Sequence, residues 1–135
     1  MNQRGFATLE VILMVMVIGI LASIAVPRFT SVTTAANTAK IQSDLTTIDT
    51  AIAIYTMEKG TEPSDIKTDL KDYIRGASDL NPPSGKCFIQ GKEKEIPSGG
   101  YQITTPSGES EKRATLGGNT AEKFYTQKKT GTSTT

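Results

Sequence analysis

The residue best placed to do chemistry in this 135-residue chain is an acid at the head of a long apolar run. Glu10 stands directly before Val11–Val26, a segment that carries no charged side chain. A charge at the centre of a bilayer costs roughly 2.5–3.5 kcal/mol on insertion scales, so a plain membrane anchor has no use for this carboxylate. Glu10 therefore suits pairing with another charge, because a paired charge in apolar surroundings is largely compensated.

Five residues around the apolar run form a recognisable pattern. Arg4, Gly5 and Phe6 are consecutive, Glu10 lies four residues after Phe6, and Pro27 follows the end of the run. This pattern resembles the N-terminus of type IV pilins and type II secretion pseudopilins, specifically over residues 5–28 and fading by about Pro63. In that family a short basic leader ends in glycine, a prepilin peptidase cuts after it, and the new N-terminal residue is methylated. The resemblance implies that residues 1–5 are a leader, with cleavage between Gly5 and Phe6 and N-methylation of Phe6.

A different interpretation treats the N-terminal segment as an ordinary secretory signal. Ser23-Ile24-Ala25 has the small-x-small pattern of a cleavage site, and the mature chain would then begin at Val26. Glu10 fits poorly at the head of such a signal, and the apolar pattern runs on into a helix. With cleavage there, or with an uncleaved anchor, the chain would be a secreted or membrane-anchored binding protein that does not polymerise.

Residues 6–27 are predicted to form the helix that spans a membrane or lies in a filament core, because about 20 apolar residues span the hydrocarbon. Gly19 and Ser23 are small and lie four residues apart, which would let helices approach closely. Pro27 is expected to kink the helix, since proline lacks an N–H and clashes with the preceding turn. A true helix stop at Pro27 is the alternative. By the family resemblance, the stretch from Gly19 to Pro27 is also expected to bend or unwind in a filament.

The helical pattern resumes after Pro27 with a stripe of apolar residues spaced 4, 3, 4 and 3 apart: Ile41, Leu45, Ile48, Ile52 and Tyr55. Such a stripe predicts one buried face of a helix, here packed on a sheet. The polar residues between its members are expected to face solvent: Lys40, Gln42, Asp44, Thr47 and Asp49. Lys59 and Gly60 suit the end of the helix.

The remaining residues predict a small head. Ser64–Ile74 is expected to be a short helix capped by Ser64, and Gly91–Gly100 a turn region. The predicted strands are Cys87–Ile89, Tyr101–Thr105 and Arg113–Leu116, with Thr120–Thr126 a fourth strand or an irregular segment. Residues 28–127 would form the head, including the second half of the long helix, and 128–135 a disordered polar tail. The expected fold class is α+β: a pilin-like fold with a long kinked helix packed on a small antiparallel sheet.

The sequence shows no active site. It holds no histidine, and the single cysteine, Cys87, excludes both an intrachain disulfide and a multi-cysteine metal site. Many family members in Gram-negative bacteria close a C-terminal loop with such a disulfide, so that loop must differ here. A net charge of +1 argues against nucleic-acid binding driven by bulk charge. Lys123, Lys128 and Lys129 could contact DNA, but a solvated tail is the favoured explanation and nothing else in the sequence supports nucleic-acid binding. We expect no enzyme activity, cofactor or metal.

The resemblance implies a structural subunit that waits in the bacterial plasma (inner) membrane as a single-pass precursor. It would then polymerise into a helical filament, periplasmic or extracellular, of the type IV pilus or type II secretion pseudopilus kind. Its expected partners are further copies of itself, the prepilin peptidase and the assembly machinery of the inner membrane. Glu10 would pair with the Phe6 ammonium of a neighbouring copy. The sequence leaves open whether the filament is a pilus, a secretion pseudopilus or a DNA-uptake pilus.

Overall fold

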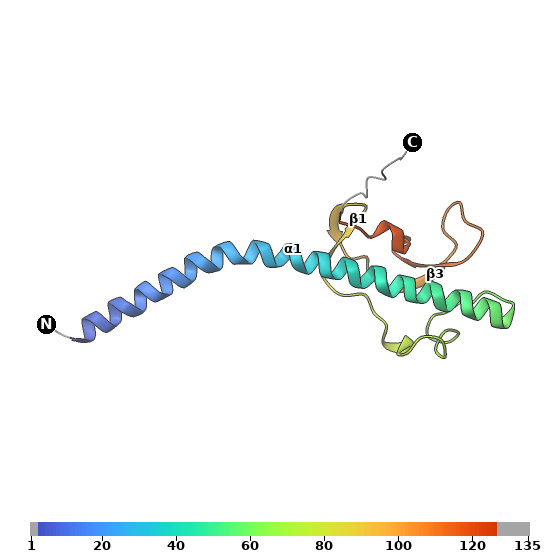
Figure 1. The fold of residues 1–135 in the computed structure, drawn as a ribbon, viewed down its shortest axis with the longest axis horizontal. Coiled ribbons are helices and arrows are strands. Elements are labelled where there is room, and N and C mark those ends of the chain that lie inside the picture. Colours follow the sequence, from blue (N-terminus) through green and yellow to red (C-terminus); the bar gives the residue numbers. More distant parts are fainter. Residues whose placement is uncertain (1–2, 127–135) are drawn as a thin grey trace, which may run out of the picture. The chain divides into compact units, whose positions relative to one another are not determined.

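The structure is a computed structural model that describes residues 3–126, apart from the side chains of Pro27 and Arg28. Its elements in chain order (Figure 1) are α1 (Gln3–Lys59), η1 (Ala77–Asp79), β1 (Lys86–Ile89), β2 (Lys92–Glu95), β3 (Tyr101–Thr104), β4 (Arg113–Leu116) and η2 (Ala121–Lys123). The chain divides into two units, Met1–Thr33 and Thr34–Thr135, and each is described by itself.

The described part of the first unit is one helical segment of α1. The helix runs through Pro27 without a break, so the alternative that Pro27 ends it is wrong. By length and composition, this part of α1 is apolar enough to cross a membrane. A kink at Gly19 or Pro27 remains a prediction.

The core of the second unit confirms the predicted stripe of α1. Ile41, Leu45 and Ile48 are fully buried, and Ile52 is nearly so. They form one hydrophobic cluster with side chains from the strands and from the C-terminal segment: Cys87, Ile89, Tyr101, Ala114, Leu116 and Phe124. The helix ends at Lys59 as predicted, because Gly60 takes the left-handed conformation (φ +71°) that commonly follows a helix.

The strands form two separate antiparallel hairpins instead of the single sheet that the sequence suggested. β1 pairs with β2, with Lys86 opposite Glu95, and β3 pairs with β4, with Tyr101 opposite Leu116. β2 lies in the region predicted to be a turn, so that prediction is wrong. Its Lys-Glu-Lys-Glu sequence is exposed at every position and lacks the apolar alternation that marks a strand, and only pairing with β1 makes it one.

The turn that joins β1 to β2 accounts for this pairing. Gln90 and Gly91 both have positive φ, 53° and 75°. A two-residue loop with positive φ at both positions matches the twist of two antiparallel strands. The tight loop therefore brings the charged segment back alongside β1.

One other predicted element is also wrong. Ser64–Ile74 forms turns and no helix. Two side chains bind its backbone: Asp65 Oδ1 accepts the N–H groups of Lys67 and Thr68, and Asp69 Oδ2 accepts that of Ser64. The apolar residues of this segment, Ile66, Leu70 and Ile74, are nevertheless buried together. For residues 120–126 the irregular alternative is confirmed, since the chain forms η2 and no strand there. The predicted tail at 128–135 lies outside the described residues.

Candidate functional site

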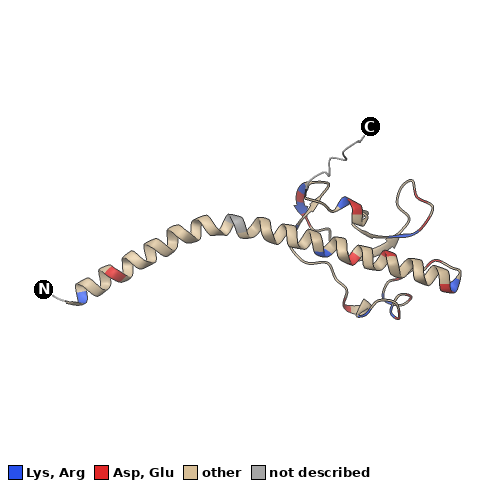
Figure 2. Ribbon diagram, viewed as in Figure 1, with Lys and Arg blue, Asp and Glu red and all other residues tan. Residues whose placement is uncertain are grey.

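The N-terminal half of α1 exposes apolar side chains on all its faces. From Phe6 to Val26, the large hydrophobic side chains are between 50 % and 65 % exposed. Figure 2 shows the charged residues gathered mainly in the second unit, while this part of the helix is almost free of them. A helix that is apolar on all faces is unfavourable in water, so this surface requires an apolar environment that the chain itself does not supply.

The hydroxyl groups of this segment are satisfied within the helix. Thr8 Oγ1 donates to the Arg4 carbonyl at 2.9 Å, and Ser23 Oγ donates to the Ile20 carbonyl at 2.7 Å. Such bonds let these hydroxyls enter an apolar environment at little cost. Glu10 is the single charged residue between Arg4 and Arg28. The backbone N–H groups beside it are bonded within the helix, so they cannot compensate the charge of its carboxylate.

Glu10 lies on an exposed apolar surface of α1, next to the side chains one and two turns further on: Leu13, Met14, Val17 and Ile18. Phe6 is four residues earlier, and residues four apart lie on the same face of a helix. An ammonium group on Phe6 would therefore be within one turn of Glu10 in the same chain. The roles of Gly5, Phe6 and Glu10 in cleavage, methylation and assembly stay predictions.

Gly19 and Ser23 also lie on an open helix surface. A Cβ atom added to Gly19 would meet no atom within 4 Å. The close approach of a neighbouring helix at Gly19 stays a prediction.

The second unit holds a polar cluster that the sequence did not reveal. Asp49 Oδ2 accepts hydrogen bonds from Arg113 Nε at 3.1 Å and Nη2 at 2.9 Å, and Asp49 Oδ1 accepts one from the Ala114 N–H at 2.7 Å. Arg113 also contacts Glu122 at 2.6 Å and Glu109 at 3.5 Å. The hydrogen bonds to Asp49 and Glu122 raise the pKa of Arg113. Asp49 thus ties α1 to β4.

A second carboxylate on the same helix has a similar role. Asp44 Oδ2 accepts hydrogen bonds from the Tyr101 hydroxyl and from Lys40 Nζ, both at 2.6 Å. Burial, together with the bond to Asp44, raises the pKa of Tyr101. We expected Asp44 and Asp49 to face solvent, which is wrong: both are partly buried beside the strands. Lys40 lies at the local i, i+4 spacing from Asp44, but Tyr101 and Arg113 lie 57 and 64 residues from their acids. No local sequence pattern could have identified these two distant partners.

Neither cluster has the character of a reactive centre. Every carboxylate in them is paired with a cation or a hydroxyl, and among the described residues no three His, Cys, Asp or Glu side chains come together as metal ligands. Cys87 is fully buried, as predicted, and burial raises the pKa of its thiol. A buried thiol with a raised pKa behaves as a small hydrophobic side chain.

This chain is 29 % identical over 110 residues to the type II secretion system core protein G of Klebsiella michiganensis, a match that covers 78 % of this chain and 75 % of that protein. The core protein G of Pectobacterium carotovorum is 32 % identical over 100 residues, 74 % of this chain and 57 % of that protein. The type IV narrow pilus major component PilA5 of Thermus thermophilus is 38 % identical over 58 residues, 43 % of this chain and 50 % of that protein.

The chain therefore spans half to three quarters of the length of these relatives. No protein-family model matches it, and no solved structure matches it closely. The relatives are pseudopilins and a pilin, and the structure has the long N-terminal helix and small antiparallel sheets of an α+β pilin-like fold. This chain belongs to the family of type IV pilins and type II secretion pseudopilins.

Proposed function

We propose that this chain is a structural subunit that polymerises into a helical filament through the N-terminal half of α1. The observation that carries the proposal is the apolar surface of residues 6–26, exposed on all faces, with Glu10 as its one charge. A membrane would cover the apolar surface but would leave Glu10 unexplained. A bundle of identical helices covers the same surface and also supplies a partner for the acid.

We infer the following sequence of events. The precursor inserts in the bacterial inner membrane, the prepilin peptidase cuts between Gly5 and Phe6, and the Phe6 amine is methylated. The new ammonium then lies one turn from Glu10. In the filament, an axial offset between subunits would bring the Phe6 ammonium of one copy level with Glu10 of the next. Pairing would favour one offset, because any other would leave two charges buried without partners.

We further propose that the filament is a pseudopilus of the type II secretion kind. The similarity to three core protein G relatives extends over 97 to 110 residues and so includes much of the head, while that to a fourth spans 63 residues. The similarity to the pilus component is higher in identity but spans 58 residues. A type IV pilus is therefore the second candidate, and filament length in the native cell together with the secretion phenotype of a deletion strain separates the two.

The test of assembly uses Glu10→Ala and Glu10→Gln in cells that lack the unmodified protein. Both variants should insert and be cleaved at the same bond, so that each mature chain begins with a methylated Phe6, since neither substitution touches the cleavage site. Glu10→Ala should give few or no sheared filaments by electron microscopy, and Glu10→Gln should assemble poorly, because it keeps the shape but not the charge. Thr8→Ala is a matched control, because Thr8 lies on the same helix and bonds only to its own backbone. Abundant normal filaments from Glu10→Ala would remove the pairing proposal.

A further inference from the structure

The two hairpins of the head have four outer edges, and α1 or a turn covers two of them. Along β1, the Phe88 N–H donates to Thr38 Oγ1 at 2.8 Å, and the Lys86 carbonyl accepts from Asn37 Nδ2 at 3.0 Å. Along β4, Asp49 accepts the Ala114 N–H, and Leu116 exchanges backbone hydrogen bonds with Asn119. These edges cannot accept another strand.

The edges of β2 and β3 differ in how they are protected. β2 has the sequence Lys-Glu-Lys-Glu and is exposed along its whole length. Charged side chains, lysine above all, discourage edge-to-edge pairing. β3 reads Tyr-Gln-Ile-Thr and carries no charge. β3 therefore lacks the protection that its counterpart has.

The register of β3 shows which of its backbone groups face outwards. Ile103 lies opposite Ala114, whose N–H points away from β3 to Asp49. In an antiparallel pair such a position is not hydrogen-bonded, so the Ile103 N–H and C=O also point away from β4. The same holds for Tyr101, two residues earlier and opposite Leu116. Within residues 3–126, no hydrogen bond reaches these four outward groups.

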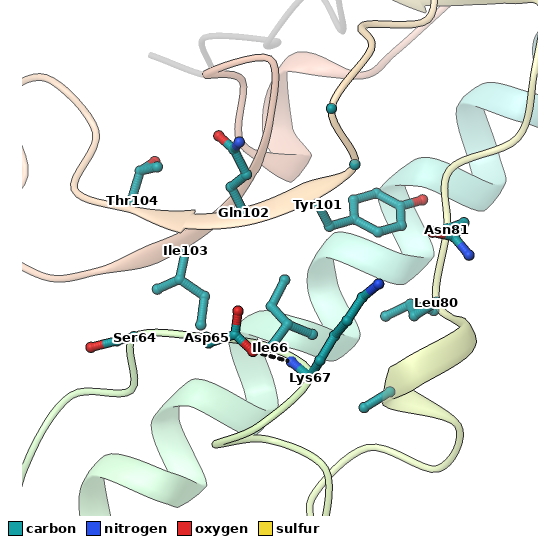
Figure 3. A pocket seen from close by; sticks show the side chains of 13 residues that line it. Ser64, Asp65, Ile66, Lys67, Leu80, Asn81, Tyr101, Gln102, Ile103 and Thr104 are labelled. Carbon is teal, nitrogen blue, oxygen red and sulfur yellow. Dashed lines mark hydrogen bonds between the residues drawn. The ribbon is translucent and has the colours of Figure 1, made fainter.

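This edge borders a groove of about 450 Å³ (Figure 3), between β3 and the segments at 64–67 and 77–81. Ile66, Leu80, Tyr101 and Ile103 give it an apolar patch, and the rest of its lining is largely polar. Figure 3 shows that Ile103 points towards Ile66, while Gln102 and Thr104 point to the opposite side of β3. Free backbone donors and acceptors beside apolar side-chain pockets are the features that bind an extended peptide as an added strand.

We propose that this groove binds the segment Thr130–Thr135 of a neighbouring subunit as a strand along β3, an inference that rests on the proposed function. The segment is uncharged, and Thr130, Thr132 and Thr134 recur at every second position. In an extended chain they share one face, and threonine favours strands. Their methyl groups would face the apolar lining, and the backbone of the segment would pair with Tyr101 and Ile103.

The contacts of the C-terminal segment favour a neighbour over the same chain. The Tyr125 carbonyl accepts the Gly91 N–H, so the described chain ends against the turn of the first hairpin. In Figure 1, η2 lies on one side of α1 and η1, which borders the groove, lies on the other. The described chain thus ends on the side of α1 away from the groove.

The test places cysteines in full-length subunits that are co-expressed in the native cell. One copy carries Gln102→Cys, on the face of β3 away from the groove, and the other carries Ser133→Cys or Thr132→Cys. If Thr132 faces the groove, Ser133 faces the same side as Gln102. Mild oxidation of sheared filaments should then give about tenfold more disulfide-linked dimer with Ser133→Cys than with Thr132→Cys, because only side chains on one face come within bonding distance.

Glu95→Cys in place of Gln102→Cys is the matched control, because Glu95 is exposed on the outer strand of the other hairpin. It should give no dimer with either tail variant. Filaments without any Ser133→Cys dimer, or equal yields at 132 and 133, would overturn the proposal. A disulfide that forms only when both cysteines are on one chain would overturn the assignment to a neighbour. A lack of filaments from the unmodified protein would instead contradict the proposed function itself.

A second measurement needs no substitution in the head. Amide hydrogen exchange at Tyr101 and Ile103 should be about tenfold slower in filaments of the full chain than in filaments of a chain that stops at Gln127, because paired amides exchange slowly. Equal exchange in the two filaments would contradict strand addition.

Discussion

The two halves of α1 are continuous in the backbone but opposite in their surroundings. From Phe6 to Val26, exposed apolar side chains cover the helix on all faces, and the hydroxyl groups of Thr8 and Ser23 bond to the helix itself. After Thr34, the apolar side chains form one stripe that is buried by the strands, and two acids on the flanks of the stripe bind the strands. The second half is therefore satisfied within the chain, whereas the first half depends on an environment outside it.

This contrast makes the two halves separable by experiment. All four tyrosines, Tyr55, Tyr73, Tyr101 and Tyr125, lie in the second unit, and the chain has no tryptophan. The near-ultraviolet circular dichroism of tyrosine therefore reports on the head alone, in detergent, while membrane extraction reports on the first half.

The largest effect on stability is expected from Leu45→Ala. Leu45 is fully buried in the core of the head, and a leucine-to-alanine change at such a site costs about 2–5 kcal/mol through lost burial and the cavity left behind. The tyrosine signal should melt at a lower temperature, while the protein still resists alkaline extraction from membranes. Val32→Ala, a deletion at an exposed apolar residue of the first half, should leave the melting temperature unchanged.

The converse change is Val17→Asp, which puts a charge in the middle of the exposed apolar half. Placing an aspartate at the centre of a membrane helix costs about 3 kcal/mol, which corresponds to a shift of roughly a hundredfold in the insertion equilibrium. The variant should be extracted from membranes at alkaline pH, yet its head should melt as before in detergent. A head that unfolds in this variant would show that the two halves are not independent.

A smaller effect is expected from Asp49→Ala. The change leaves Arg113 and the Ala114 N–H without their shared acceptor, and unsatisfied buried groups of this kind cost about 1–3 kcal/mol. Asp49→Asn should be intermediate, since it keeps an acceptor for the N–H but not the charge. Thr50→Ala, at the next position on the exposed side, should change stability by less than about 0.5 kcal/mol.

The smallest effect concerns the pH dependence of the head. The hydrogen bond from Arg113 lowers the pKa of Glu122 from 4.5 to about 2. Because the folded pKa lies below the unfolded one, Glu122 contributes stability above its unfolded pKa and loses it as the pH falls towards 2. Between about pH 5 and pH 2.5, the melting temperature of Glu122→Gln should therefore fall less than that of the unmodified protein. The tyrosine circular dichroism measures both melting temperatures. Asp65 and Asp69 also have lowered pKa values, so part of the acid sensitivity should remain.

The sequence predicted those features that depend on local periodicity. The buried stripe of α1 follows from the spacing of its apolar residues, and the end of α1 at Lys59 follows from Gly60. The apolar runs between glycine-rich turns predicted the strands at Cys87, Tyr101 and Arg113. The structure differs where tertiary pairing overrides local preference. β2 is a strand of alternating charges that pairs only with β1. The segment Ser64–Ile74 forms turns in which Asp65 and Asp69 accept backbone N–H groups of the same segment.

The candidate site divides in the same way. Glu10 stands out because a charge within an apolar run has no local explanation, so the sequence alone points to it. Asp49 looks like an ordinary polar residue of an amphipathic helix, and its partner Arg113 lies 64 residues further on. Its role as the link between α1 and β4 depends on a fold that brings the two together, which no local pattern records.

The unbroken run of α1 through residues 3–59 has a mechanical consequence. A tensile load applied to the apolar half passes into the head along a single helix, with no loop between them to stretch first. Inside the head, that load acts along the row of Ile41, Leu45 and Ile48, whose contacts with the strands would all have to slide together. Contacts loaded in parallel share the force, whereas contacts at a flexible tether would be peeled one after another. The head is therefore held by an attachment suited to being pulled along the axis of its own helix.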